Sequence, residues 1–261
     1  MKFASFPKFA FLLPIAGILT MALAGCGATS NLGLTQGNWA FSASSTAPGK
    51  VVSGPTFVVG GNLTQSGNSL TGTMYITQSG CIPPQFVGFT GTVKDKNVTL
   101  TSASFGGQVI SVTASGTKDS LTGTYTVTGE CADSGTVTAS PVASISGTWN
   151  GTIPNPTQGI AQATLSVALT QSATASEDGT FALSGTLTYT NSTCSVSGTI
   201  SNGYVAGNFI SFSGSTDDGT GDVSFDPFLL DSVTAPKNMT GTYAFSSADC
   251  NQSQSITLTK Q

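Results

Sequence analysis

Apolar and polar residues alternate with a period of two over most of the chain. In the segment LTGTYTV, Leu121, Tyr125 and Val127 fall on one face and the intervening threonines on the other. One buried face and one solvated face are typical of an antiparallel strand. Eight such runs in the first half predict strands near residues 38–43, 56–65, 69–78, 86–94, 97–105, 108–117, 120–128 and 135–140, and the second half predicts about eight more.

Short clusters of Gly, Asn, Asp and Lys between the runs predict turns. These clusters lie at residues 66–68, 94–97 and 118–119 in the first half, and at 177–179, 201–203 and 217–219 in the second. We therefore predict an all-β protein. An eight-stranded meander fits a closed antiparallel barrel, which leaves no edge strand. A two-sheet β-sandwich has the same strand pattern and stays open as the alternative.

The two halves of the chain repeat each other. Three motifs recur in the same order, namely G-x-W at residues 37–39 and 147–149, LTQS at 63–66 and 169–172, and TGTY at 122–125 and 240–243. Collinear matches predict a tandem duplication of a domain of about 110 residues. We place the first β-domain at residues 37–141 and the second at 145–261, with Pro141 interrupting the pattern between them.

The N-terminus has the pattern of a signal peptide. Lys2 and Lys8 precede an apolar run, residues 9–22, that is short for a membrane-spanning helix. The run ends in Leu23-Ala24-Gly25-Cys26, which resembles the lipobox of bacterial lipoproteins. The resemblance implies that residues 1–25 are removed and that Cys26 bears the lipid. Residues 26–36 would then be a tether that links the protein to the membrane.

The same resemblance implies a place in the bacterial cell envelope. Residue 27 is Gly and not the Asp that favours inner-membrane retention in enterobacterial lipoproteins. We therefore expect the outer membrane, on its periplasmic or surface face. More than one acyl chain gives stable anchoring, since each buried methylene contributes about 0.8 kcal/mol.

The remaining cysteines predict disulfides. With Cys26 assigned to lipid, an even number is left, namely Cys81, Cys131, Cys194 and Cys250. Four cysteines allow three connectivities, but one pair in each copy favours Cys81–Cys131 and Cys194–Cys250. A bridge across a loop of this length stabilises a domain by about 4 kcal/mol on the chain-entropy model.

Charge and composition weigh against several functions. The chain has no arginine and no histidine, and six lysines face twelve acids after Cys26. A chain without a basic surface is a poor partner for nucleic acid. Without histidine it also lacks the usual general base and the commonest zinc ligand. We expect no catalytic residues and no cofactor.

The Gly-x-Trp at the head of the first strand, followed by an eight-stranded meander, resembles lipocalins, and the LTGTY strands resemble avidins. The resemblance implies a calycin-like barrel. Lipocalins generally cover that tryptophan with an arginine, which this chain lacks, so no ligand follows. Trp39 and Trp149 are candidate ligand-stacking residues; the alternative is that each closes one end of a core.

The acidic segment of the second copy is a weak candidate for Ca²⁺. Asp217, Asp218, Asp222 and Asp226 offer oxygen ligands at short spacing. The Asp-Gly pair at 218–219 is equally typical of a solvated hairpin turn.

Two functions remain in view. The first is a non-enzymatic lipoprotein of the cell envelope that binds a small molecule or a glycan. The second is a structural or surface-interaction lipoprotein without a ligand pocket.

Overall fold

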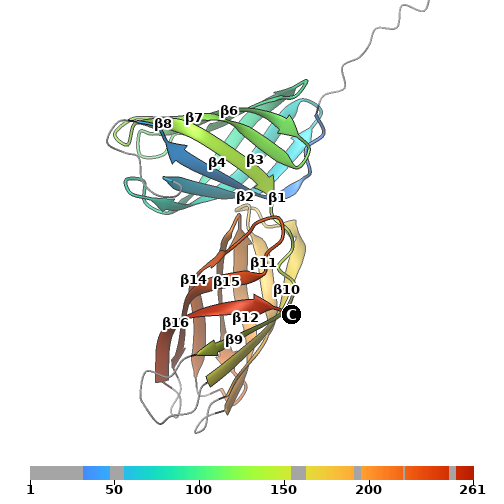
Figure 1. Cartoon of the computed structure of the whole chain (residues 1–261), viewed down its shortest axis with the longest axis vertical. Helices are drawn as coiled ribbons and strands as arrows, with labels where there is room; N and C mark the ends of the chain where they lie inside the picture. The colour runs from blue at the N-terminus through green and yellow to red at the C-terminus, as the bar shows by residue number, and fades with distance from the viewer. Residues whose placement is uncertain (1–31, 48–55, 154–162, 191–194, 220, 247–250) are drawn as a thin grey trace, which may run out of the picture. The chain divides into compact units, whose positions relative to one another are not determined.

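The computed structural model describes residues 32–47, 56–153, 163–190, 195–219, 221–246 and 251–261. The first eight strands form a closed antiparallel barrel in which each strand pairs with the next. They are β1 (Gly37–Ser45), β2 (Phe57–Ser66), β3 (Ser69–Ser79), β4 (Gln85–Lys94), β5 (Asn97–Ser102), β6 (Val109–Thr117), β7 (Ser120–Thr128) and β8 (Asp133–Pro141). Strand β8 closes on β1 from Trp39↔Pro141 to Ser45↔Gly135 (Figure 1).

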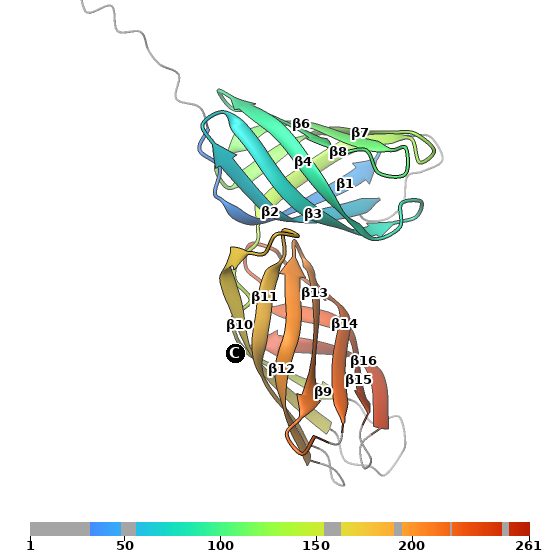
Figure 2. The same cartoon turned by 180° about the vertical axis from the view of Figure 1, so that it is seen from behind.

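The other eight strands form a second closed antiparallel barrel. They are β9 (Gly147–Ile153), β10 (Ala163–Ala175), β11 (Phe181–Thr190), β12 (Ser195–Ala206), β13 (Phe209–Thr216), β14 (Asp222–Leu230), β15 (Asn238–Ser246) and β16 (Asn251–Lys260). Its closing ladder pairs Thr259 with Asn150 and Lys260 with Trp149 (Figure 2). Within the described part of the chain, no helix is both long and apolar enough to cross a membrane.

The barrel prediction is confirmed, and the sandwich alternative is wrong. The predicted strands of the first half match β1 to β8 closely, and the repeat corresponds to the two barrels. One predicted turn, at residues 201–203, was wrong because these residues lie inside β12 at a bulge. Gly203 is needed for close packing, since a Cβ there would lie 2.6 Å from the Cβ of Phe212. The chain turns later, at Gly207, where φ is +61°.

Residues 32–36, which the sequence predicts to be part of the tether, pack on the first barrel. Leu34 is buried in the core of the first barrel, and Leu32 packs against the same core. The Leu32 amide donates to the Asp95 carbonyl at 2.7 Å, and the Thr35 amide donates to the Lys118 carbonyl at 3.0 Å. Residues 32–36 are therefore part of the barrel and do not act as a free linker.

The repeated LTQS motif explains how each barrel holds the segment before its first strand. In the first copy, Gln65 Oε1 accepts a hydrogen bond from the Leu34 amide at 2.8 Å. In the second copy, Gln171 Oε1 accepts one from the Ile145 amide at 2.9 Å. Leu34 and Ile145 are both buried. In both barrels the glutamine thus provides a hydrogen-bond acceptor for a backbone amide of a buried residue. Without this partner the amide would be unsatisfied, and the free energy of unfolding would be lower.

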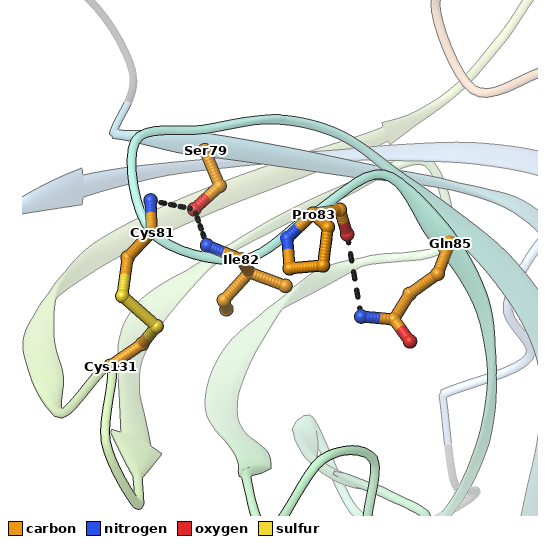
Figure 3. Close-up of a disulfide and its surroundings, with 6 residues drawn as sticks. All are labelled: Ser79, Cys81, Ile82, Pro83, Gln85 and Cys131. Carbon is orange, nitrogen blue, oxygen red and sulfur yellow. Dashed lines mark hydrogen bonds between the residues drawn. A yellow bond between two sulfur atoms is a disulfide. The ribbon is translucent and has the colours of Figure 1, made fainter.

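A disulfide joins Cys81 to Cys131, as predicted, with their Cα atoms 5.8 Å apart. It links the loop after β3 to the turn between β7 and β8. Figure 3 shows that Ser79 orders this loop, because its Oγ accepts hydrogen bonds from the amides of Cys81 at 3.2 Å and Ile82 at 2.9 Å. Cys26, Cys194 and Cys250 lie outside the described residues, so the second disulfide and the lipidation remain predictions.

Candidate functional site

The interior of the first barrel is filled by its own side chains. A cavity of about 10 Å³ remains, which is about the space of one water molecule. Its walls are Phe41, Phe57, Val59, Met74, Phe89, Leu100, Ile110, Val112, Tyr125 and Val137. Between the described side chains of this interior there is no room for a ligand of the size that lipocalin-like barrels hold.

The Tyr125 hydroxyl in this core is hydrogen-bonded to a residue of the barrel wall. Tyr125 Oη donates to Asp133 Oδ2 at 2.6 Å, and Ser45 Oγ donates to Asp133 Oδ1 at 2.6 Å. Burial and the bond to Asp133 raise the pKa of Tyr125. The phenol therefore stays neutral and acts as a structural donor at physiological pH.

Aromatic rings fill the second barrel. Phe212 and Phe225 stack with their centroids 4.2 Å apart, and Tyr189 lies 5.0 Å from Phe245. Burial is the main cause that raises the pKa of Tyr243 to about 12. Ring pairs at these distances add stability beyond the area that they bury, so this core is a packed structural element.

Trp39 and Trp149 lie in these cores and present no ring face to solvent, since the exposed fraction of each side chain is 0%. Trp39 Nε1 donates to the Thr35 carbonyl at 2.6 Å, and Trp149 Nε1 donates to the Ile145 carbonyl at 2.8 Å. Both tryptophans are therefore in the positions expected of residues that close the cores. A ligand could stack on either indole only if it displaced the protein atoms that cover the ring.

The candidate calcium ligands are not gathered into one site. Asp218 Oδ1 accepts from Thr216 Oγ1 at 2.5 Å within the β13–β14 turn, as an ordinary turn residue does. Asp217 and Asp222 lie beside the same turn, whereas Asp226 lies within β14. Among the described residues, no group of three or more acidic, Cys or His side chains could hold a metal ion.

The described residues of the two barrels meet at a junction, and one asparagine joins them. Asn38 on β1 is 7% exposed. Its Oδ1 accepts from the Gly207 amide at 2.7 Å, and its Nδ2 donates to the Gly207 carbonyl at 3.2 Å. The Asn62 amide also donates to the Gly179 carbonyl, at 2.9 Å. These contacts satisfy buried polar groups of both barrels at once.

Glycine is required where the barrels touch. A Cβ on Gly60 would lie 2.2 Å from the Cα of Gly207 and 2.7 Å from its amide nitrogen. A side chain at Gly179 would likewise meet the Thr73 carbonyl oxygen at 2.1 Å. Because the blocking atoms are backbone, no rotamer change can relieve the overlap. The β12–β13 turn therefore packs directly on β2.

A cavity of about 390 Å³ lies beside this turn, within the size range of small-molecule sites, which occur preferentially at domain interfaces. Its apolar walls are Ala40, Val58, Ala139, Leu230 and Val233, and its polar walls are Ser42, Thr138, Ser140, Asn208, Asp231 and Ser232. The Asn208 Oδ1 atom is buried and has no hydrogen-bond partner among the described residues.

The carboxylate in the cavity wall is already engaged. Asp231 Oδ1 accepts from the amides of Lys237 and Asn238, each at 3.1 Å, and its Oδ2 accepts from Asn238 Nδ2 at 3.0 Å. The Asn238 amide is the largest cause that holds the pKa of Asp231 below its usual value. Asp231 is therefore an ionised turn residue.

Comparison with known proteins identifies no relative: no family model matches the chain, and no curated protein matches it.

The residues of this cavity were not predicted from the sequence, although the sequence contains one signal of them. In the run FVVGG, Val58 stands on the face opposite Phe57 and Val59, where an ordinary one-sided strand has a polar residue. Val58 is 5% exposed, and Ala40 beside it is 7% exposed. An apolar residue on the outward face indicates that a second surface covers the strand.

Proposed function

We propose that this chain is a lipid-anchored protein of the bacterial cell envelope that binds a small, neutral, polar molecule such as a sugar without transforming it. The cavity at the barrel junction is the observation on which the proposal rests. The described side chains of both barrel interiors are packed, whereas this cavity of about 390 Å³ offers space together with several polar groups.

The chemistry of the walls favours an uncharged ligand. Hydroxyls of Ser42, Thr138 and Ser140 can donate and accept hydrogen bonds. The cavity lining contains no cationic side chain, and Asp231 contributes a negative charge. An anionic ligand would meet repulsion there, whereas a polyhydroxylated ligand can pair with the hydroxyls and cover Val58 and Leu230 with its apolar edges.

Binding without catalysis is supported by the state of the polar groups. The chain has no histidine, and the cavity carboxylate accepts three hydrogen bonds from its own turn. A general base must be free to take a proton from the substrate. The anchoring half of the proposal rests on the signal-peptide pattern and on the lipobox-like LAGC that ends at Cys26.

Filling the cavity tests the proposal. Thr138 lines the cavity and is exposed, whereas Thr136 lies on the same face of β8, is also exposed and lies outside the lining. Calorimetric titration with neutral monosaccharides and disaccharides is expected to show binding to the parent protein and to Thr136→Trp, and loss of binding in Thr138→Trp. Binding that survives Thr138→Trp refutes the cavity as the site, and failure of every sugar at millimolar concentration refutes the class of ligand.

The alternative is a structural or surface-interaction lipoprotein without a functional pocket. It is favoured by the threonines that face solvent in register across neighbouring strands of the first barrel. Thr92 pairs with Thr99, Thr99 with Thr113, and Thr113 with Thr124. Such a face offers hydroxyls to another envelope component, and an empty cavity in the titrations would favour this function.

A further inference from the structure

Four aromatic side chains form a continuous cluster across the barrel junction, which we name the aromatic platform (Tyr75, Phe86, Tyr204 and Phe209). Tyr75 and Phe86 are paired residues of β3 and β4, and their ring centroids are 4.7 Å apart. Tyr75 lies 5.1 Å from Phe209, Phe209 lies 5.9 Å from Tyr204, and Tyr204 lies 6.3 Å from Phe86.

The exposed apolar surface of the described residues gathers at this platform. Their large hydrophobic side chains are buried or half-buried with two exceptions, Phe86 at 40% exposed and Leu229 at 38%. Phe86 belongs to the platform, and Leu229 is paired with Phe209 across β13 and β14. Within the platform, Phe86 is the exposed ring, Tyr75 and Tyr204 are half-buried, and Phe209 is buried at 8% exposed. Apolar side chains that gather at one place on an otherwise polar outer surface are typical of a binding site.

Two carboxylates, Asp226 and Asp178, act on the tyrosines of the platform. The pKa of Tyr75 is raised by burial and, to a smaller extent, by the negative charge of Asp226. Burial is also the main cause that raises the pKa of Tyr204 to about 12, followed by Tyr75, Asp226 and Asp178. Both tyrosine hydroxyls are therefore neutral donors near neutral pH, and the charged groups that act on them are carboxylates.

We propose that the aromatic platform binds an uncharged glycan chain, as a site separate from the junction cavity. The apolar face of a sugar ring packs on Phe86, and its hydroxyls donate to the Asp226 carboxylate and accept from the tyrosines. Rings supply apolar contact area with a fixed geometry, while a few polar groups set the orientation of a ligand. The platform and the cavity lining share no residue, so this site is independent of the proposed small-molecule site.

The negative charge near the platform and its few exposed apolar side chains favour a neutral glycan over an acidic glycan, a nucleic acid or a protein. Acidic glycans and nucleic acids carry negative charges that the carboxylates repel. The buried centre of a stable protein interface is more apolar than the surrounding surface, whereas two large apolar side chains of the described residues, Phe86 and Leu229, are exposed here. A single row of neutral sugar rings matches both the small area and the charge.

The test is affinity electrophoresis through gels that contain soluble neutral polysaccharides, with acidic polysaccharides as the comparison. Phe86→Ala is expected to weaken binding to a neutral polysaccharide about tenfold, and Phe86→Trp is expected to restore it. Thr90→Ala is the matched control, because Thr90 is exposed on the same face of β4. Circular dichroism melts check that the partly exposed Phe86 can be removed without unfolding the barrel.

Three results would overturn the platform as a glycan site. The first is a full-length protein that no polysaccharide retards. The second is retardation that Phe86→Ala leaves unchanged, and the third is a preference for acidic polysaccharides. Thr138→Trp separates the two sites: polysaccharide binding lost in that variant but kept in Phe86→Ala would assign the glycan to the cavity instead.

Discussion

Replacement of Gly60 by alanine is expected to separate the barrels without unfolding either one. The added Cβ would lie 2.2 Å from the Cα of Gly207, whereas carbon atoms in contact are about 3.5–4.0 Å apart. The junction must therefore open by about 1.3–1.8 Å at this point. No side chain can move aside, because the nearest atoms all belong to the backbone.

Opening by this amount removes the hydrogen bonds beside it. The Asn38–Gly207 bonds of 2.7 and 3.2 Å would stretch to about 4 Å or more, which is too long for a hydrogen bond. A buried polar group without a partner costs about 1–3 kcal/mol, so the docked arrangement loses about 2–6 kcal/mol from the two bonds. Separation lets water satisfy the same groups, so the barrels are expected to come apart.

Amide hydrogen exchange measured by NMR reports directly whether the hydrogen bonds across the junction are lost. The amides of Gly207 and Asn62 donate across the junction, and both are expected to lose protection in Gly60→Ala while amides inside each barrel keep theirs. Small-angle scattering is expected to show a larger radius of gyration. Gly88→Ala is the control, because a Cβ at Gly88 meets no atom within 4 Å. Wild-type protection of Gly207 and Asn62 in Gly60→Ala would refute the close approach.

Three further predictions concern the anchor, the disulfide and the tyrosines. Cys26→Ser is expected to move the protein from the membrane fraction to the soluble fraction of a bacterial host, and retention in membranes would contradict the lipobox interpretation. Cys81→Ser and Cys131→Ser are each expected to lower the free energy of unfolding of the first barrel by about 4 kcal/mol, and the double variant by no more than either one; additive losses in urea titrations would contradict a shared bond. The pKa values of Tyr204 and Tyr243 are raised from 10.0 to about 12 in the folded protein, so the unfolded chain loses these protons first and stability is expected to fall as the pH rises from about 10 to about 12. Urea midpoints that stay constant over that interval would refute the raised pKa values.

Local patterns were sufficient to predict the strands of the first barrel, whereas the first disulfide was predicted from the duplication, with one pair of cysteines in each copy. In β7, burial alternates along the strand as the sequence does, with Leu121, Tyr125 and Val127 inside. The turn prediction at residues 201–203 failed because glycine occurs both in turns and where two strands approach closely. Gly203 was interpreted as a turn residue, but it allows β12 to approach Phe212 closely. A glycine next to Asn fits a turn and a close approach equally well, and only the neighbouring strand distinguishes them.

The sequence by itself determined the class of fold, because the alternation of apolar and polar residues decides which face of each strand is buried. It also determined the duplication, since the motifs recur in one order, and it favoured the pairing of Cys81 with Cys131, which the structure contains. Only the tertiary structure decided what covers the outward face of β1 and β2. The contact between Asn38 and Gly207 joins residues 169 positions apart, and the junction cavity takes its walls from both barrels. Periodicity records how a strand faces its own barrel, whereas a surface between two barrels depends on how both have folded.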